Sequence, residues 1–375
     1  MEKENKRYYI ELEVLTPLSV GAGNEKDWVK GVDFVYDKNK KKVYVIDMEK
    51  AIATKVVSIG DLSVALMQDN DGALKSKLGS RLKEIAAYTF DAPIDSANPI
   101  KSFLRTQLMD RPLIPGTSLK GAIRSCLFNH LHGLGKKGGS NDTNETVFGT
   151  MKAGDVFTRF IHVGDIVMPD TQLVNTKIFN LQLDGKNWIG GWKHSGGTTT
   201  QFKPTGFNTL YECVAPRARG VGNINLMSRA FEMICRKVAQ QQYLDKKHRL
   251  MEGDLKMLFD IINTNTYNYL QKEAEFFETY SSGVDRVTEI ISSIDRIISK
   301  IPEDNSYCVM KMAAGSGFHS ITGDWQYNDY IDEPGLWSSG RNSGKKKYKS
   351  RKIAEYAGKL QLMGFVIIRE VSAPS

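Results

Sequence analysis

The stretch at residues 112–131, PLIPGTSLKGAIRSCLFNHL, constrains the fold of this chain more than any other. Pro115 and Gly116 end an extended run, and Thr117 or Ser118 can cap a helix that follows. Apolar side chains then recur at helical intervals, at Leu119, Ala122, Ile123, Cys126, Leu127 and Leu131. The spacing predicts an amphipathic helix with one buried stripe.

Two basic residues mark the beginning of this predicted helix. Lys120 and Arg124 lie four residues apart and therefore share a face in its first two turns. Free backbone N–H groups and the positive end of the helix dipole lie there too, and such an end can hold a phosphate. The alternative is a core helix with two solvated cations. Gly121 between them costs about 1 kcal/mol relative to alanine, which indicates a close backbone neighbour.

Length and composition set broad limits. With 375 residues the chain is long enough for two domains, and its net charge of +8 favours a polyanionic partner. The cysteines form no CxxC pair, so neither a zinc site nor a disulfide framework is indicated. The sequence shows no signal peptide and no apolar run of about 20 residues, so we expect a cytoplasmic protein without a membrane partner. We also expect no cofactor.

The remaining patterns predict an α+β fold. Residues 7–15 alternate as a strand, and the loop TPLSVGAG follows at 16–23, where Gly21 and Gly23 permit a tight turn whose amides can face a ligand. Residues 32–36 and 42–47 form a hairpin. Further strands are expected within 155–168, 207–216, 307–314 and 362–368, and helices within 50–90 and 226–301. This order predicts sheets covered by helices on one face.

Several of these phrases resemble the RAMP superfamily of CRISPR-associated proteins, first IPGTSLKGAIR and TPLSVGAG. Together with KGVDFVYDKNKKKVYVIDMEKA, YECVAP, GSGFHS, KYKSRK and LMGFV, they are most similar to the family that forms the fifth subunit of the type III-A Csm interference complex. The resemblance implies two ferredoxin-like (RRM-like) RAMP modules with helical insertions. The first would span residues 1–204 with an insertion near 50–100, and the second residues 205–375 with one near 226–301.

The same resemblance implies a function. Members of this family cap the filament of backbone subunits at the 3′ end of the CRISPR RNA and support its maturation. The implied partners are CRISPR RNA, target RNA and other Csm subunits, above all the adjacent backbone subunits. The matching positions expected near RNA phosphates are Gly21, Gly23, Ser118, Lys120, Arg124, Gly315 and Gly317.

A basic run adds direct electrostatic evidence for nucleic acid. Residues 341–352, RNSGKKKYKSRK, carry seven cations and no acid. We add Lys345, Lys346, Lys347, Lys349, Arg351 and Lys352 to the predicted RNA-binding residues. The alternative is a solvated charge run in a loop. Residues 187–204 combine two tryptophans with two lysines, and their rings either stack on bases or pin that loop to the core.

An enzyme is the competing class of function. In the resemblance, the Asp of Gly31-Val32-Asp33 corresponds to a carboxylate that supports metal-dependent RNA cleavage in backbone subunits. No second carboxylate stands at a useful spacing, although two-metal chemistry needs several oxygen ligands. His162 or His319 would serve a metal-independent nuclease, but a histidine on a strand such as His162 is more typical of a packed core. We therefore expect no catalytic and no metal-binding residue. A repeating backbone subunit is disfavoured by length and by the Glu-Cys element.

Overall fold

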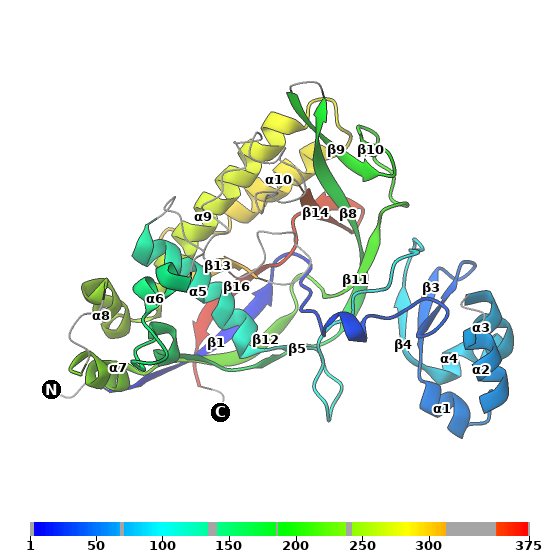
Figure 1. The fold of residues 1–375 in the computed structure, drawn as a ribbon, viewed down its shortest axis with the longest axis horizontal. Coiled ribbons are helices and arrows are strands. Elements are labelled where there is room, and N and C mark those ends of the chain that lie inside the picture. Colours follow the sequence, from blue (N-terminus) through cyan, green and yellow to red (C-terminus); the bar gives the residue numbers. More distant parts are fainter. Residues whose placement is uncertain are drawn as a thin grey trace.

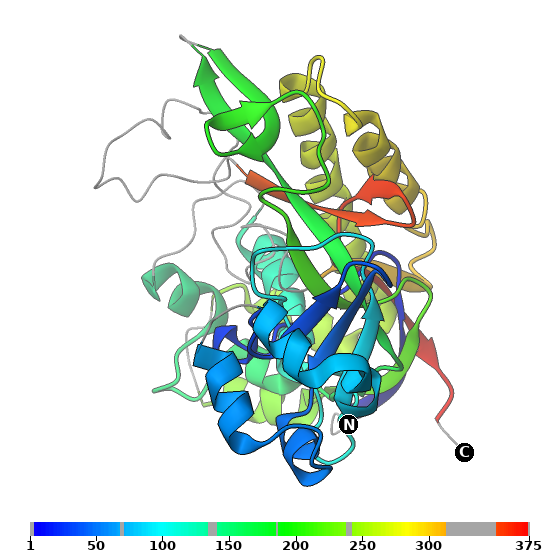
Figure 2. The ribbon, with the colours of Figure 1, turned by 90° about the vertical axis from the view of Figure 1, so that its right-hand side faces the viewer.

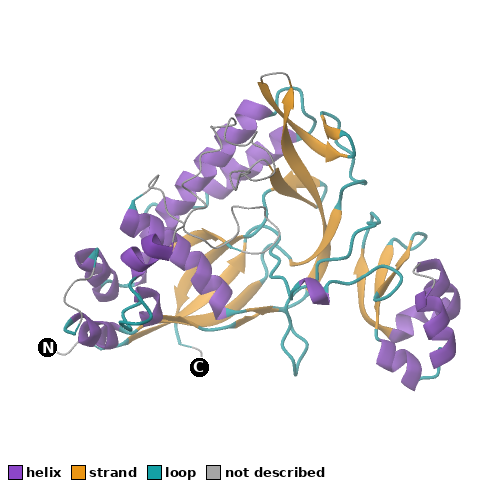
Figure 3. Cartoon of the chain, in the orientation of Figure 1, coloured by secondary structure: helices purple, strands orange, loops and turns teal. Residues whose placement is uncertain are grey.

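Antiparallel sheets and helices make up the fold, as the α+β prediction requires (Figure 3). The structure is a computed structural model that describes residues 4–67, 71–133, 141–184, 187–237, 242–312 and 350–373. Of the helices in these ranges, none is long and apolar enough to cross a membrane.

A five-stranded antiparallel sheet joins the two ends of the chain. Its order is β13-β16-β1-β12-β6. The strands are β1 (Lys6–Val14), β6 (Ile161–Val163), β12 (Arg219–Leu226), β13 (Tyr307–Lys311) and β16 (Phe365–Val371). The first strand thus pairs with β12 on one side and β16 on the other. The expected domain boundary lies between residues 204 and 205. This sheet contains strands from both sides of it: β1 and β6 come before the boundary, and β12, β13 and β16 come after it.

Helices cover one face of this sheet (Figure 1). They are α5 (Gly116–His132), α6 (Asn141–Phe148), α7 (Ser228–Cys235), α8 (Leu244–Glu252) and α9 (Leu255–Tyr280). All six apolar positions predicted for the helix of residues 112–131 are buried in α5, which confirms the stripe. They pack with Ile10 and Leu12 of β1 and with Leu258 of α9 in one core. Full burial of each such aliphatic side chain stabilises the fold by about 1.5–3 kcal/mol.

A second, six-stranded sheet centres on the long strand β8. Its path is β10-β9-β8-β14-β15, and β11 pairs with β8 as well. The strands are β8 (Thr171–Asp184), β9 (Asn187–His194), β10 (Gly197–Thr199), β11 (Thr209–Val214), β14 (Ser350–Tyr356) and β15 (Lys359–Gln361). Residues 187–204 therefore contain two strands. Trp192 is only 1% exposed and packs on Phe179, so this ring belongs to the core.

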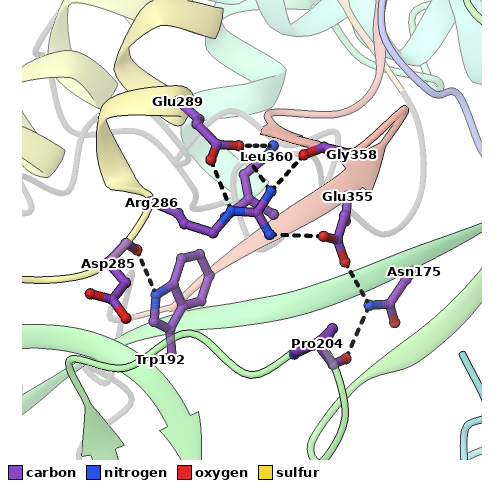
Figure 4. Close-up of polar contacts among 9 residues, drawn as sticks. All are labelled: Asn175, Trp192, Pro204, Asp285, Arg286, Glu289, Glu355, Gly358 and Leu360. Carbon is purple, nitrogen blue, oxygen red and sulfur yellow. Dashed lines mark hydrogen bonds and ion pairs between the residues drawn. The ribbon is translucent and has the colours of Figure 1, made fainter.

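The helix α10 (Val287–Ile298) is fastened to this sheet by Arg286, the residue before it (Figure 4). Its guanidinium donates to Glu289 at 2.8 and 3.0 Å, to Glu355 of β14 at 2.8 Å and to the Gly358 carbonyl at 2.7 Å. Glu289 also accepts from the Leu360 amide at 2.8 Å. These hydrogen bonds raise the pKa of Arg286, and they orient α10 over the β14–β15 hairpin.

A smaller lobe lies at one end of the molecule, at the right in Figure 1 and toward the viewer in Figure 2. A three-stranded sheet contains β2 (Phe34–Asp37), β3 (Lys42–Ile46) and β4 (Ala86–Asp91). The helices are α1 (Met48–Ala53), α2 (Ile59–Met67), α3 (Asp71–Leu78) and α4 (Leu82–Ile85). The predicted hairpin and the helices expected within 50–90 are confirmed.

Candidate nucleic-acid interface

The glycine loop and the beginning of α5 are held together by the segment between them. Gly21 forms a bridge with Phe103, and the Leu104 amide donates to the Val20 carbonyl at 2.8 Å. On its other side, the Leu104 carbonyl accepts from Leu113 at 2.8 Å, in the short strand β5 (Leu113–Ile114) that leads into α5. The glycine loop and the strand before α5 are about 95 residues apart in sequence, yet both form hydrogen bonds with the same segment around Leu104.

A buried carboxylate fixes that middle segment. Glu212 of β11 is 0% exposed, and it accepts hydrogen bonds from the Phe103 amide at 2.7 Å and the Thr171 hydroxyl at 2.5 Å. It also forms an ion pair with Arg105, whose guanidinium lies 4.1 Å from the centre of the Tyr88 ring. The glutamate of the YECVAP phrase thus has a structural role, which the sequence motif did not reveal.

The N-terminus of α5 is capped from a distant part of the chain. No side chain at its own beginning forms a cap, so the expectation for Thr117 or Ser118 is wrong. Instead the Gly116 amide donates to Oδ1 of Asp165 at 2.7 Å. A Cβ atom on Gly116 would lie 2.0 Å from the Val163 carbonyl oxygen. Only glycine lets α5 begin this close to β6. The close contact places the carboxylate of Asp165, two residues after Val163, within hydrogen-bonding distance of the Gly116 amide.

Replacement of Asp165 by alanine is expected to lower the free energy of unfolding by about 1 kcal/mol. The change leaves the Gly116 amide without its acceptor and removes a negative charge from the positive end of the helix dipole. Chemical denaturation of the two proteins measures the difference. Asp165→Asn keeps an oxygen acceptor and should lose less. Equal stability of Asp165→Ala and the wild type would show that this cap contributes nothing.

The two cations predicted to share a face of α5 have different surroundings. Arg124 places its guanidinium 4.5 Å from the ring centre of Phe148 in α6. Lys120 is partly buried, and its pKa is lowered by burial and by the positive charge of Arg159. Arg159 belongs to a 3₁₀ turn, η3 (Phe157–Phe160), that runs directly into β6. Sequence reasoning did not include it, because no motif connects it to α5.

The other positions of the predicted RNA-binding set that the structure describes around α5 reach solvent. Ser118 is partly exposed, and Gly21 and Gly23 are exposed. Gly23 has a φ of 113°, a conformation that residues with a side chain rarely adopt. The glycine loop therefore presents its backbone to the outside.

The basic run is only partly described. Gly315, Gly317, Lys345, Lys346, Lys347 and Lys349 lie outside the described residues. Arg351 differs from the expectation of a solvent-facing cation. It is 2% exposed, and its Nε donates to Glu273 of α9 at 2.7 and 2.9 Å. Lys352 on the opposite face of β14 donates to the Tyr211 hydroxyl, and burial together with Lys101 lowers its pKa to about 8.

The residues weighed for catalysis are dispersed. Oδ2 of Asp33 accepts from the Val29 amide at 2.7 Å within a local turn. His162 is exposed on β6, so the expectation that it packs in the core is wrong; this edge strand turns the ring outward. His319 lies outside the described residues. In the described ranges no group of three or more His, Cys, Asp or Glu side chains is placed to hold a metal ion.

A model of the RAMP superfamily matches residues 11–352. The chain belongs to the RAMP superfamily. Two solved structures share the fold of this RAMP protein at 17% sequence identity. One is a chain in the cryo-EM structure of a Csm–crRNA–target RNA ternary complex in a type III-A CRISPR-Cas system, with a TM-score of 0.65 over 97% of this chain and 100% of that one. The other is the crystal structure of Csm5 from T. onnurineus, with a TM-score of 0.62 over 95% and 99%. No curated protein matches.

Proposed function

We propose that this RAMP protein is a non-catalytic CRISPR RNA-binding subunit of a type III-A Csm interference complex. The observation that carries the proposal is the fold shared with Csm5 and with a chain of a Csm complex over almost the full length of all three chains. In the proposal the protein caps the filament of backbone subunits at the 3′ end of the CRISPR RNA and supports maturation of that RNA. CRISPR RNA, target RNA and the adjacent backbone subunits are its partners.

The geometry of the interface supports an RNA-binding role. The glycine loop exposes Gly21 and Gly23, and hydrogen bonds through residues 100–105 connect it to β5, the strand that leads into α5 with Ser118 and Lys120. Exposed backbone amides and cations hold phosphates without reading base identity. Guide pairing would then supply the sequence specificity. We leave Arg351 out of the RNA-facing set, because its guanidinium is engaged with Glu273 in the interior.

We further propose that the five-stranded sheet is a ferredoxin-like module. The strands β1, β6, β12 and β16 with the helices α5 and α9 follow the order β-α-β-β-α-β along the chain, and the strands are adjacent in the sheet. In this assignment β13 is an added edge strand, and α7 and α8 lie in the helical insertion. The six-stranded sheet with α10 is our candidate for the second module.

One experiment tests binding and cleavage together. Labelled CRISPR-repeat-derived RNA and an unrelated RNA are incubated with the wild type and with Asp33→Ala, in magnesium and in chelator. We expect RNA binding without cleavage in every case, because the carboxylate of Asp33 is engaged by the Val29 amide. Cleavage that requires magnesium and disappears in Asp33→Ala would identify a nuclease instead. Cleavage that persists in chelator would favour a metal-independent nuclease.

The position in the complex needs its own test. Complexes reconstituted with backbone subunits and a CRISPR RNA carrying photoreactive nucleotides at either end should give cross-links to this protein from the 3′ end. Cross-links from the 5′ end alone, or several copies per complex, would contradict a cap at the 3′ end.

A further inference from the structure

A cavity of about 260 Å³ lies between the C-terminal half of α5 and the helix α9, which pack against each other (Figure 1). Both helices contribute to its lining: Cys126, Asn129 and His130 from α5, and Asp260, Thr264 and Asn265 from α9. At a rise of about 1.5 Å per residue, Asn129 lies about 16 Å along the helix from Ser118. The cavity is therefore separate from the candidate nucleic-acid interface at the other end of α5.

The buried part of this lining contains a hydrogen-bond acceptor that lacks a donor. Nδ2 of Asn129 donates to Oδ1 of Asn265 at 2.9 Å, and Nδ2 of Asn265 donates to Sγ of Cys126 at 3.4 Å. Asn129 is 2% exposed, and its own Oδ1 accepts no hydrogen bond from the part of the chain that the structure describes. A buried acceptor without a donor is unfavourable, so a ligand that brings an N–H group is stabilised here.

The charge of the lining favours a cation. Among the described residues that line the cavity, Asp260 supplies the one negative charge, and its Oδ1 accepts from Asn305 at 3.0 Å. Burial and then Lys246 lower the pKa of His130, so this ring is neutral at pH 7. The amine of Lys246 donates to the carbonyls of His130 and Leu131 at 3.0 and 3.4 Å and so offsets the negative end of the α5 dipole. The carboxylate of Asp260 remains, and it attracts a cation and repels a phosphate.

We infer that this cavity binds a guanidinium group. A guanidinium is always charged and has five N–H donors and no acceptor, so it matches a site formed by acceptors. Oδ1 of Asn129, the carboxylate of Asp260 and the hydroxyl of Thr264 are those acceptors. They come from two helices, and the planar fork of donors can bond in several directions at once, whereas an ammonium is a compact point charge. Ile261 adds an apolar surface for the carbon stem.

Two sources offer the same chemistry, an arginine side chain of a partner protein and a free guanidino compound. The inference goes beyond the proposed function, because it requires no contact with RNA. The probe for both sources is N-acetyl-arginine methylamide, and its binding to the full chain is measured by ligand-observed NMR. The citrulline derivative is the matched control, since its ureido group has a similar shape but no charge.

We expect the citrulline derivative to bind at least about tenfold more weakly than the arginine derivative, because a hydrogen bond between two charged groups is the stronger kind. Equal affinity of the two derivatives would overturn the inference. No binding of the arginine derivative would overturn it as well and would leave a cavity that holds water only.

Variants of the lining test the assigned acceptors. Asp260→Asn removes the charge and keeps an oxygen for Asn305, and it should weaken binding of the arginine derivative about tenfold. Thr264→Val changes an exposed position and should weaken binding about fivefold through the lost hydroxyl. Glu275→Gln removes an exposed carboxylate elsewhere on α9 and should change nothing. Unchanged binding in Asp260→Asn would contradict the assignment.

The assembled complex distinguishes the two sources. If a partner subunit supplies the arginine, the derivative no longer binds to the complex, and Asp260→Asn is incorporated less well than Glu275→Gln. If the derivative binds to the complex as it does to the free chain, the ligand is a free guanidino compound. RNA binding is measured in the same samples. Failure of the wild-type complex to bind RNA would contradict the proposed function, whereas failure of the arginine derivative to bind would contradict this inference alone.

Discussion

Replacing Glu273 by alanine is expected to lower the free energy of unfolding by about 3–5 kcal/mol. Glu273 is 0% exposed and holds the buried guanidinium of Arg351 with two hydrogen bonds from Nε. Its charge also favours the protonated form of Lys311, whose pKa burial lowers to about 7. Without this carboxylate, the buried cation of Arg351 loses the acceptor of both Nε hydrogen bonds, and removing one partner of a buried ion pair is the costly way to break it.

Urea denaturation of paired variants separates the charge effect from the loss of side-chain volume. Glu275→Ala changes an exposed glutamate of the same helix and should alter stability by less than about 0.5 kcal/mol. The double variant Glu273→Leu/Arg351→Met replaces both charges by apolar side chains and should recover most of the loss. If Glu273→Ala is as stable as Glu275→Ala, the ion pair does not hold β14 to α9.

The contrast between α5 and Arg351 shows what the sequence alone can predict. The stripe of α5 follows from the helical period within one segment, so local spacing is enough to identify its buried positions. In β14 the period is two, and local spacing does not say which of Arg351 and Lys352 faces the interior. That depends on α9, which covers one side of the strand and supplies Glu273 from 78 residues away in sequence. Arg351, which the sequence places among the cations available to RNA, therefore faces the interior.

In the candidate interface, too, the sequence could predict the role of some residues and not of others. The glycine of the loop at 16–23 that needs a positive φ, Gly23, was identifiable because glycine adopts that conformation at little cost. Asp165 was not, because it reaches α5 only through the close packing of Gly116 on β6. Glu212 was noticed as part of a phrase, yet its role depends on three hydrogen-bonding partners from two distant segments. Contacts between segments, rather than patterns within them, decide such roles.

Glu212→Ala is expected to destabilise the protein by about 3–5 kcal/mol and to weaken RNA binding as well. The change leaves Arg105, a largely buried cation, without its carboxylate and leaves the Phe103 amide without its acceptor. Residues 100–105 would then no longer hold the glycine loop in register with β5 and α5. Denaturation measures the first effect, and RNA affinity below the unfolding transition measures the second.

Two matched variants distinguish the ion pair from its surroundings. Thr171→Val removes the hydroxyl that donates to Glu212 and accepts from Arg105 but keeps the ion pair, so it should cost only about 2 kcal/mol and leave RNA affinity unchanged. Arg105→Met/Glu212→Leu removes both charges and should regain stability relative to Glu212→Ala, because no cation stays buried alone. The Phe103 amide still lacks its acceptor in that double variant, so the glycine loop remains loosened. RNA affinity should therefore stay low even where stability returns, and a full return of both would mean that Glu212 acts on RNA binding through stability alone.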